Sequence, residues 1–478
     1  MGCSRPSGCS RRRFTRTGYL IPMAAIEILT IETKALGDRS YVIVDGDVAA
    51  VVDPQRDIDR IEALLAERRL RLTHVFETHV HNDYVTGGLE LSHTHGATYV
   101  LAADDDVAFE HTGARDGDEF TLASVVVRAI HTPGHTPNHL SYAVAVNGDP
   151  VAVFTGGSML YGTVGRTDLI DARSTEPLTR AQFHSVRRLA AELPGAVEVH
   201  PTHGFGSFCS SASTSGTDHS TIAQERLSNL ALTGDDEDTF VARLLAGLTA
   251  YPRYYAHMAG INRQGPANVD LSPPEMVDPV EIRRRIHRGE WVVDLRSRTA
   301  FARGHLAGTL NVEVGDSFAT YLGWTMRWGT PVTLVGDTPD DVAEAQRQMV
   351  RIGIDRPMGR AEGGLDRWSA GGDVRGYRSV SFAELADARA EHEVAVLDVR
   401  RDDEWAEGHI DGAVHIPLHD LEARLDEIPD GEVWVHCASG YRAAIAASLL
   451  DRAGHRIVAI DDDWASAAQH GLPITSAN

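Results

Sequence analysis

The chain has 478 residues, which is long enough for about three domains of ordinary size. Its 68 acidic residues outnumber its 45 basic residues and give a net charge of −23, which argues against nucleic acid or an anionic membrane surface as a partner. No apolar run approaches the roughly 18 residues of a membrane span. The four cysteines are too few for a disulfide framework and fit reduced thiols, so we expect a cytoplasmic protein.

Residues 1–22 do not have the composition of a folded segment, because Ser, Gly and Arg dominate them. The run Ser10–Phe14 is weakly similar to a twin-arginine export signal, but the apolar stretch that follows is short and interrupted by Pro22. We expect a disordered tail, or an upstream start that precedes a natural start at Met23.

A first domain is expected over residues 23–262, with many short strands and a few helices. Asp45-Gly46 lies between two alternating apolar runs and predicts a hairpin. Helical periodicity is predicted for Ile58–Arg68 and for Thr175–Leu193. The further predicted strands are Val75–Thr78, Val125–Ile130, Leu140–Val146 and Val151–Thr155.

The rest of the chain is an internal repeat that follows a Pro- and Gly-rich linker, residues 263–278. The pattern of Asp294–Gly308 recurs at Asp398–Gly412, 104 residues further on. Strands alternating with helices at this spacing predict two tandem α/β domains with parallel sheets, residues 279–375 and 376–478. The strands and helices expected after the repeated pattern are Pro331–Val335 and Asp340–Ile352 in the first copy, and Glu432–His436 and Tyr441–Ala453 in the second.

Three histidine clusters in the first domain each follow an apolar strand, where a rigid element can position a metal ligand. The clusters are His79-x-His81-x-Asp83, His131–His139 with His135 at its centre, and His200–His203. This pattern predicts a metal site. For His93, His95, His111, His184 and His219 we prefer the simpler interpretation of surface histidine.

These motifs, with Thr132-Pro-Gly-His135 and Gly165-Arg-Thr-Asp168, resemble the metallo-β-lactamase superfamily, and most closely glyoxalase II and the persulfide dioxygenases. The resemblance implies an αββα sandwich with a metal at one edge. It also implies a first metal position formed by His79, His81 and His135, and a second to which Asp83 and His203 contribute. Persulfide dioxygenases bind one iron through two histidines and a carboxylate, and those histidines correspond to His79 and His135.

Two residues depart from the superfamily pattern. Tyr84 stands where a histidine is common, and Gly157 stands where an aspartate usually bridges two metals or binds iron. A two-metal hydrolase would therefore lack two ligands, and we predict one divalent metal, iron, with zinc as the alternative. An inactive, metal-poor domain is the other interpretation. Aspartate at position 157 would restore a carboxylate unless the backbone requires glycine there.

Cys437 lies between a predicted strand and a predicted helix. The free N–H groups and the dipole at the helix start favour a thiolate, and Arg442 adds positive charge to a loop that can hold an anion. The segment resembles a rhodanese domain with a six-residue active loop. The first copy resembles a second rhodanese, but Gly336 replaces the cysteine, so we assign it a structural or docking role. Cys209 is either a small apolar residue or a sulfur acceptor.

Together the motifs resemble persulfide dioxygenase–rhodanese fusions, and the resemblance implies sulfide detoxification. The metal domain would oxidise a low-molecular-weight persulfide of the glutathione type to sulfite. Cys437 would carry sulfane sulfur as a persulfide and exchange it with sulfite, thiosulfate or a thiol. Two alternatives remain: a thioester hydrolase of the glyoxalase II type with accessory rhodaneses, and a sulfurtransferase or sulfur relay with an inactive metal domain. The thiol carrier and the formation of a homo-oligomer stay open.

Overall fold

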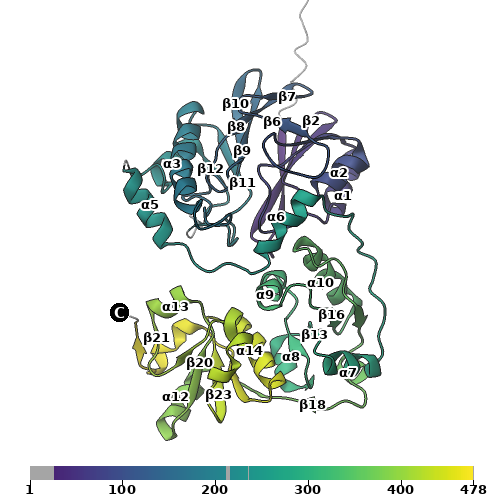
Figure 1. The fold of residues 1–478 in the computed structure, drawn as a ribbon, viewed down its shortest axis with the longest axis vertical. Coiled ribbons are helices and arrows are strands. Elements are labelled where there is room, and N and C mark those ends of the chain that lie inside the picture. The colour runs from purple at the N-terminus through teal and green to yellow at the C-terminus, as the bar shows by residue number, and fades with distance from the viewer. Residues whose placement is uncertain (1–25, 212–215, 235, 477–478) are drawn as a thin grey trace, which may run out of the picture.

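The computed structural model describes residues 26–211, 216–234 and 236–476. The predicted tail, residues 1–22, lies outside the described residues. Figure 1 shows an N-terminal lobe and a C-terminal lobe, with helices α6, α9 and α10 between them. Within the described ranges, none of the helices combines the length and apolar character needed to cross a membrane.

Two mixed six-stranded sheets form the centre of the N-terminal lobe. The first has the order β1-β2-β3-β4-β5-β6, with strands β1 (Glu27–Thr33), β2 (Asp38–Asp45), β3 (Val48–Val52), β4 (Arg71–Phe76), β5 (Thr98–Ala102) and β6 (Thr112–Ala114). The second has the order β12-β11-β10-β9-β8-β7, with strands β7 (Glu119–Leu122), β8 (Val125–His131), β9 (Leu140–Val146), β10 (Asp149–Gly156), β11 (Glu198–Pro201) and β12 (Ser220–Thr221). The predicted hairpin is the antiparallel pair β2 and β3.

Helices cover the outer face of each sheet and complete the predicted αββα sandwich. Strand β2 illustrates the layering, because its side chains alternate between faces. Tyr41 and Ile43 belong to the core between the sheets, whereas Val42 and Val44 pack with α1 and α2. The helices of this lobe are α1 (Asp59–Arg68), α2 (Gly88–His95), α3 (Thr175–Glu192), α4 (Ile222–Ser228), α5 (Glu237–Ala246) and α6 (Tyr255–Gln264).

The first α/β domain has a four-stranded parallel sheet of order β15-β13-β16-β17. Its strands are β13 (Trp291–Asp294), β15 (Leu310–Asn311), β16 (Val332–Val335) and β17 (Gly359–Ala361), with β14 (His305–Leu306) paired to β18 (Val374–Arg375) apart from them. Its helices are α7 (Pro279–His287), α8 (Arg298–Arg303), α9 (Phe318–Thr325), α10 (Pro339–Arg351) and α11 (Leu365–Trp368).

The second α/β domain repeats this arrangement in a five-stranded parallel sheet of order β19-β24-β23-β20-β22. Its strands are β19 (Arg378–Val380), β20 (Ala395–Asp398), β22 (Val414–His415), β23 (Glu432–His436) and β24 (Arg456–Ile460), with β21 (His409–Ile410) paired to β25 (Ile474–Thr475). Its helices are α12 (Phe382–Glu391), α13 (Asp402–Glu407) and α14 (Tyr441–Arg452), with short 3₁₀ helices η1 (Leu418–Ala423), η2 (Leu425–Glu427), η3 (Trp464–Ser466) and η4 (Ala468–His470).

The structure differs from the expected organisation at the start of the linker. Helix α6 continues to Gln264, two residues beyond the expected end of the first domain at 262. Gly265 ends the helix because its φ of 85° is unfavourable for other residues. The equivalence of the two repeats is confirmed: Gly336 follows β16 and Cys437 follows β23, the strands at matching places in the two sheets.

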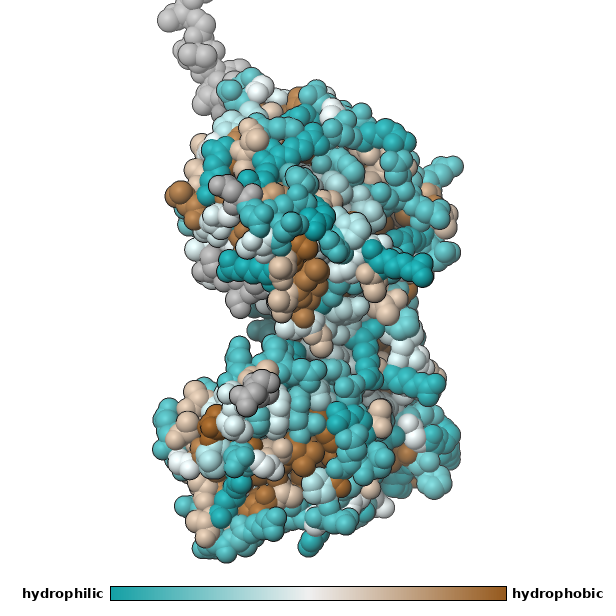
Figure 2. All heavy atoms as spheres, turned by 60° about the vertical axis from the view of Figure 1, so that its left-hand side comes forward, coloured by the Kyte–Doolittle hydropathy of each residue, from teal (hydrophilic) through white to brown (hydrophobic). Residues whose placement is uncertain are grey.

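The first α/β domain docks against loops of the sandwich. The N–H of Val85 donates to the carbonyl of Arg351 at 2.7 Å, and the hydroxyl of Thr320 donates to the carbonyl of Ala35 at 2.9 Å. An apolar cluster crosses the same junction, with Leu36, Tyr84, Cys209 and Tyr254, Tyr255 and Met258 from the sandwich, and Ala319 and Ile352 from the α/β domain. Figure 2 shows this junction as a waist between two largely hydrophilic lobes.

A buried ion cluster strengthens the junction. The guanidinium of Arg351 donates two hydrogen bonds to the Asp57 carboxylate, at 3.0 and 2.7 Å. Arg60 and Arg347 approach the same carboxylate. Burial opposes the charged form of Asp57, but the neighbouring guanidinium groups outweigh it and lower the pKa of this carboxyl. Asp57 therefore links the start of α1 to the end of α10 as a charged group.

Asp57→Asn should weaken the docking of the two lobes. Removing one member of a buried ion pair costs about 3–5 kcal/mol, because the remaining guanidinium loses its compensating charge. We expect a lower melting temperature and faster proteolysis of residues 265–278. The pKa of Asp57 in the folded protein lies below its ordinary value of about 3.9. The stabilisation that the Asp57 carboxylate gives to the folded protein is therefore present above that pH, and it is lost as the pH falls through the folded pKa.

The matched control is Asp387→Asn on α12, where the side chain is exposed. It should leave melting and proteolysis unchanged. Equal behaviour of the two variants would show that the Asp57 cluster does not hold the lobes together.

Candidate metal centre and sulfur-transfer site

The predicted histidine clusters meet at one edge of the sandwich, where several strands end. His79 and His81 follow β4, His135 lies between β8 and β9, and His203 follows β11. Each of these four side chains is at most 2% exposed. The strand ends of both sheets therefore bring together residues that lie far apart in the sequence. The five histidines interpreted as surface residues are exposed or half-buried.

The ligand atoms form four groups, each within 4.8 Å. The groups are His79, His81 and His203; His135, His203 and Cys209; Asp38, Asp83 and His203; and Asp53, Glu77 and His81. His203 belongs to three of the four, so its position is more central than the sequence analysis predicted. Its Nε2 lies 3.3 Å from Nε2 of His79. A set of imidazole and carboxylate groups at such separations is of the kind that binds zinc or iron.

Hydrogen bonds determine which ring atoms remain available. The Nδ1–H of His135 donates to the carbonyl of Arg166 at 2.7 Å, which leaves Nε2 with a free lone pair. Nε2 of His81 faces the Tyr84 hydroxyl at 2.9 Å and leaves Nδ1 free. Among the described residues, the buried atoms at this edge that have no hydrogen-bond partner include His81 Nδ1, His135 Nε2, Glu77 Oε2, Asp38 Oδ2 and Asp83 Oδ1. Buried polar atoms normally have partners, so this set fits a bound cation.

Burial and neighbouring charges divide the histidines into two kinds. Burial lowers the pKa of His79 and lowers that of His135 to about 3, so both rings are neutral and able to bind a metal. Although burial opposes it, Asp53 and Glu77 raise the pKa of His81 to about 9. Asp83 and Asp38 likewise raise that of His203 against burial. A metal bound to His81 or His203 would displace a proton, so its affinity should fall as the pH falls.

Asp38 is a site residue that the sequence analysis missed. It begins β2, and its Oδ1 lies 2.9 Å from Nδ1 of His203, whereas Oδ2 of Asp83 lies 3.1 Å from the same nitrogen. Burial and the adjacent Asp83 raise the pKa of Asp38 to about 8. Nothing in the local sequence marks this aspartate, because its partner lies 165 residues away.

The two departures from the superfamily pattern have structural explanations. The Tyr84 hydroxyl occupies the space beside His81 and also donates to the carbonyl of Asp53, so it supports the ring by hydrogen bonding. At Gly157, a Cβ atom would overlap the imidazole of His135. Glycine is therefore required by space beside the ring, and not by a left-handed backbone, since Gly157 is absent from the positive-φ residues among those described.

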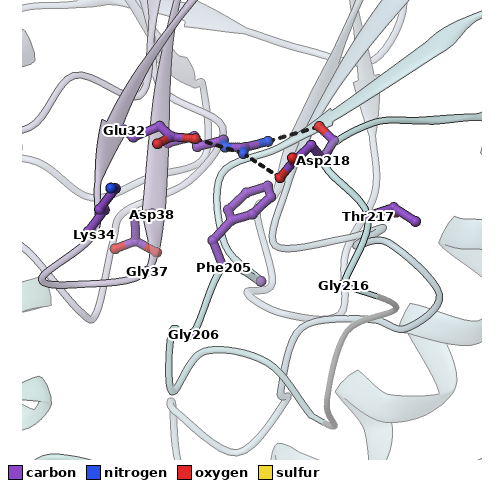
Figure 3. A pocket seen from close by; sticks show the side chains of 11 residues that line it. Glu32, Lys34, Gly37, Asp38, Phe205, Gly206, Gly216, Thr217 and Asp218 are labelled. Carbon is purple, nitrogen blue, oxygen red and sulfur yellow. Dashed lines mark hydrogen bonds and ion pairs between the residues drawn. The ribbon is translucent and has the colours of Figure 1, made fainter.

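A pocket of about 350 Å³ opens at the same edge, next to Asp38 and to Gly204, which follows His203. Figure 3 shows Phe205 beneath the guanidinium of Arg39, which is joined by hydrogen bonds to Glu32 and Asp218. Lys34, the only lysine of the chain, lies on the opposite side of the pocket, apart from this network. The pocket thus offers a cation near the candidate metal centre.

The candidate sulfur-transfer loop has the expected position between β23 and α14. Cys437 is 1% exposed. Gly440 has a φ of 85°, and a side chain there would overlap the Asp461 carboxylate, so the loop requires glycine. The Arg442 guanidinium binds both oxygens of Glu404, at 2.6 and 2.7 Å. Arg442 is thus one half of an ion pair at the end of the Cys437 loop.

All three domains meet beside this loop. Tyr321 and Trp324 of α9 line a small pocket together with His419 and Arg442 of the second α/β domain. Phe208 of the sandwich packs against Trp324 with ring centroids 4.7 Å apart. The space amounts to about 10 Å³, room for roughly one water molecule. The domain without the cysteine therefore forms one wall of a pocket that Arg442, at the end of the Cys437 loop, also lines.

Comparisons with known proteins agree with this geometry. Residues 36–203 match the Metallo-beta-lactamase superfamily, and residues 278–371 and 381–469 match the Rhodanese-like domain. The hydroxyacylglutathione hydrolase of Brucella anthropi is 31% identical over 48% of this chain and 84% of its own length. The chain belongs to the metallo-beta-lactamase superfamily, and it carries two rhodanese-like domains.

One further relative and one solved structure extend the comparison. The mitochondrial persulfide dioxygenase ETHE1 of Homo sapiens is 27% identical over 51% of this chain and 81% of its own length. The crystal structure of a metallo-beta-lactamase from Staphylococcus aureus subsp. aureus COL has a TM-score of 0.65 and 26% identity, and the match covers 71% of this chain and 99% of that one. That coverage is greater than the N-terminal lobe alone could provide.

Gly157→Asp should reduce metal content and not restore a ligand, because the new side chain would displace the His135 ring. Overpacking of this kind costs about 1–3 kcal/mol. We expect a lower melting temperature and less metal per chain by elemental analysis. Gly315→Asp is the control, since a side chain there meets open space. Tighter metal binding at an unchanged melting temperature would contradict the expectation and point to a ligand that was simply lost.

Proposed function

We propose that the protein oxidises a low-molecular-weight persulfide to sulfite at one metal ion, and that Cys437 transfers sulfane sulfur. The proposal is carried by the presence, in one chain, of the buried His/Asp cluster and of a cysteine at a rhodanese loop. The overall reaction, RSSH + O₂ + H₂O → RSH + SO₃²⁻ + 2H⁺, moves four electrons from the outer sulfur to dioxygen. Sulfite would be released by the metal domain and would be exchanged for sulfane sulfur by the rhodanese, so the two reactions would have compounds in common.

His79, His81 and His135 would hold the metal, with Asp83 and His203 beside them. A bound iron would supply the activation of dioxygen, and zinc is the alternative metal. The chain itself would orient two of the metal ligands, because the Arg166 carbonyl fixes the ring of His135 and the Tyr84 hydroxyl fixes the ring of His81. Burial of all these groups would keep bulk water away from the reacting sulfur.

The pocket next to Asp38 would bind the thiol carrier. A glutathione-type carrier has carboxylates, and the Lys34 ammonium is a cation suited to one of them. The Arg39 guanidinium is already paired with Glu32 and Asp218, so Lys34 is the better candidate. The reaction would take place in the cytoplasm, which the two free cysteines of the described ranges, Cys209 and Cys437, support.

Cys437 would act as the nucleophile of the sulfur transfer. Its thiolate attacks the sulfane sulfur of thiosulfate, an S–S bond forms, and sulfite leaves with the electron pair of the broken bond: Cys–S⁻ + S₂O₃²⁻ → Cys–S–S⁻ + SO₃²⁻. The reverse reaction would convert sulfite into thiosulfate. The N–H groups at the start of α14 would stabilise the anionic sulfur.

A thioester hydrolase is the second candidate, favoured by the 31% identity to a hydroxyacylglutathione hydrolase. Tyr84 and Gly157 count against it, because they remove two ligands from a second metal position. A sulfur relay with an inactive metal domain is the third.

The deciding experiment measures oxygen uptake and sulfite release on glutathione persulfide with the iron-loaded protein. Hydrolysis of a glutathione thioester is measured beside it. We expect about one iron per chain, oxygen uptake, and loss of both metal and uptake in His135→Ala. Thioester hydrolysis without oxygen uptake would establish the hydrolase, and sulfur transfer alone would establish the relay.

Cys437→Ser should abolish thiosulfate:cyanide sulfurtransfer, because serine cannot carry sulfane sulfur. The expected fall in rate is on the order of a thousandfold or more, as is common when a nucleophile is removed. Metal content and oxygen uptake should remain at the parent level, which serves as the internal control for folding. Retained sulfurtransfer would refute the assignment of Cys437.

A further inference from the structure

Cys209 occupies an unexplained position beside the metal centre. Its Sγ and the ring nitrogens of His135 and His203 lie within 4.8 Å of one another, and all three side chains are buried. The role of a small apolar residue accounts for the burial of Cys209. It does not account for a sulfur that faces two imidazoles, of which His135 has an Nε2 without a hydrogen-bond partner among the described residues.

The backbone of Arg166 fixes Cys209 and His135 relative to each other. Its N–H donates to the Cys209 carbonyl at 2.8 Å, and its carbonyl accepts the Nδ1–H of His135 at 2.7 Å. The guanidinium donates to the carbonyls of Phe208 and Thr249, at 3.1 and 2.7 Å. One residue thereby fixes the backbone of Cys209 and orients the free lone pair of the His135 ring, an arrangement typical of groups that support metal ligands.

The metal centre also lacks one ligand, because glycine at position 157 has no side chain that could bind a metal. The ring of His135 fills the space that a carboxylate at position 157 would need. A donor that completes the coordination must therefore come from another side. Cys209 lies in the loop after β11, close to His203 in the sequence, and its sulfur is already grouped with both rings. Thiolate with imidazole is a donor set that suits both zinc and ferrous iron.

We propose that the Cys209 thiolate is a further ligand of the metal held by His79, His81 and His135, on the side where His135 and His203 lie, in place of the carboxylate absent at position 157. The thiol releases one proton to solvent as the sulfur–metal bond forms, and no electron is transferred. The inference rests on the metal-binding part of the proposed function, and it is independent of persulfide as the substrate.

The test uses cobalt(II), because a cobalt–thiolate bond gives a charge-transfer absorption in the near ultraviolet that imidazole and carboxylate ligands do not give. The metal-free protein is titrated with cobalt(II) alone. The parent protein and Cys437→Ser should both show the band. Cys209→Ser should lose it and bind cobalt about 10- to 100-fold more weakly, a loss of the size known for groups around a metal. His135→Ala should bind little cobalt.

A second variant does not alter Cys209. Replacing Cys3, Cys9 and Cys437 by serine leaves Cys209 as the only cysteine of the chain. The band should persist there, and this result assigns it to Cys209 even if Cys209→Ser does not fold. Cobalt binding without the band, in the parent or in this variant, would overturn ligation by Cys209 and would leave the metal centre itself unaffected. Cys209 would then have a free thiol that could act as a sulfur acceptor. A parent protein that binds no cobalt overturns both the metal centre and the ligand.

Discussion

The candidate metal centre depends on one buried carboxylate, that of Asp53. It accepts hydrogen bonds from the N–H and the hydroxyl of Thr78, each at 2.7 Å, and from the hydroxyl of Thr202. Thr78 follows a strand of the first sheet and Thr202 follows a strand of the second, so Asp53 joins the two sheets at the edge where the histidines lie. Its backbone is left-handed, with a φ of 50°, a conformation that a non-glycine residue maintains only where the surroundings hold it. The same carboxylate faces Nε2 of His81 and thereby leaves Nδ1 for a metal.

The α/β domain without the cysteine has a structural role, because it contacts both of the other domains. It contacts the histidine loop at Val85 and the loop before Asp38 at Ala35, and its helix α9 lines a pocket together with Arg442, at the end of the Cys437 loop. One domain thus touches both candidate sites. Loss of the nucleophile at Gly336 leaves these contacts intact, because they come from α9 and α10 and not from the loop at that glycine.

Local pattern was sufficient to predict several of the longer strands and helices, the internal repeat and the three histidine clusters, because periodicity and strand-end motifs are short-range properties. The tertiary contacts of individual side chains could not be predicted from local pattern. Asp38 reaches the metal centre through tertiary structure, and no local signal marks it; Cys209 lies near His203 in the sequence, but only the fold shows its sulfur close to two imidazoles. Arg442 was predicted to add charge to the sulfur loop, but nothing in the sequence indicated that Glu404, 38 residues earlier, pairs with this guanidinium. Gly157 was interpreted as a missing ligand, and only the position of the His135 ring explains why a side chain is excluded there.

The hydrogen bond from Val85 to Arg351 also limits how freely these domains can be exchanged in evolution or in protein engineering. An excised sandwich would lose this hydrogen bond, one residue after Tyr84, and would expose the apolar cluster around Tyr254 and Met258 to water. A shuffled gene that joined this sandwich to an unrelated partner would have to supply both a carbonyl and an apolar cap at the same place. In this chain the sandwich and the domain docked on it therefore share one buried apolar surface, although each has the topology of a self-contained fold.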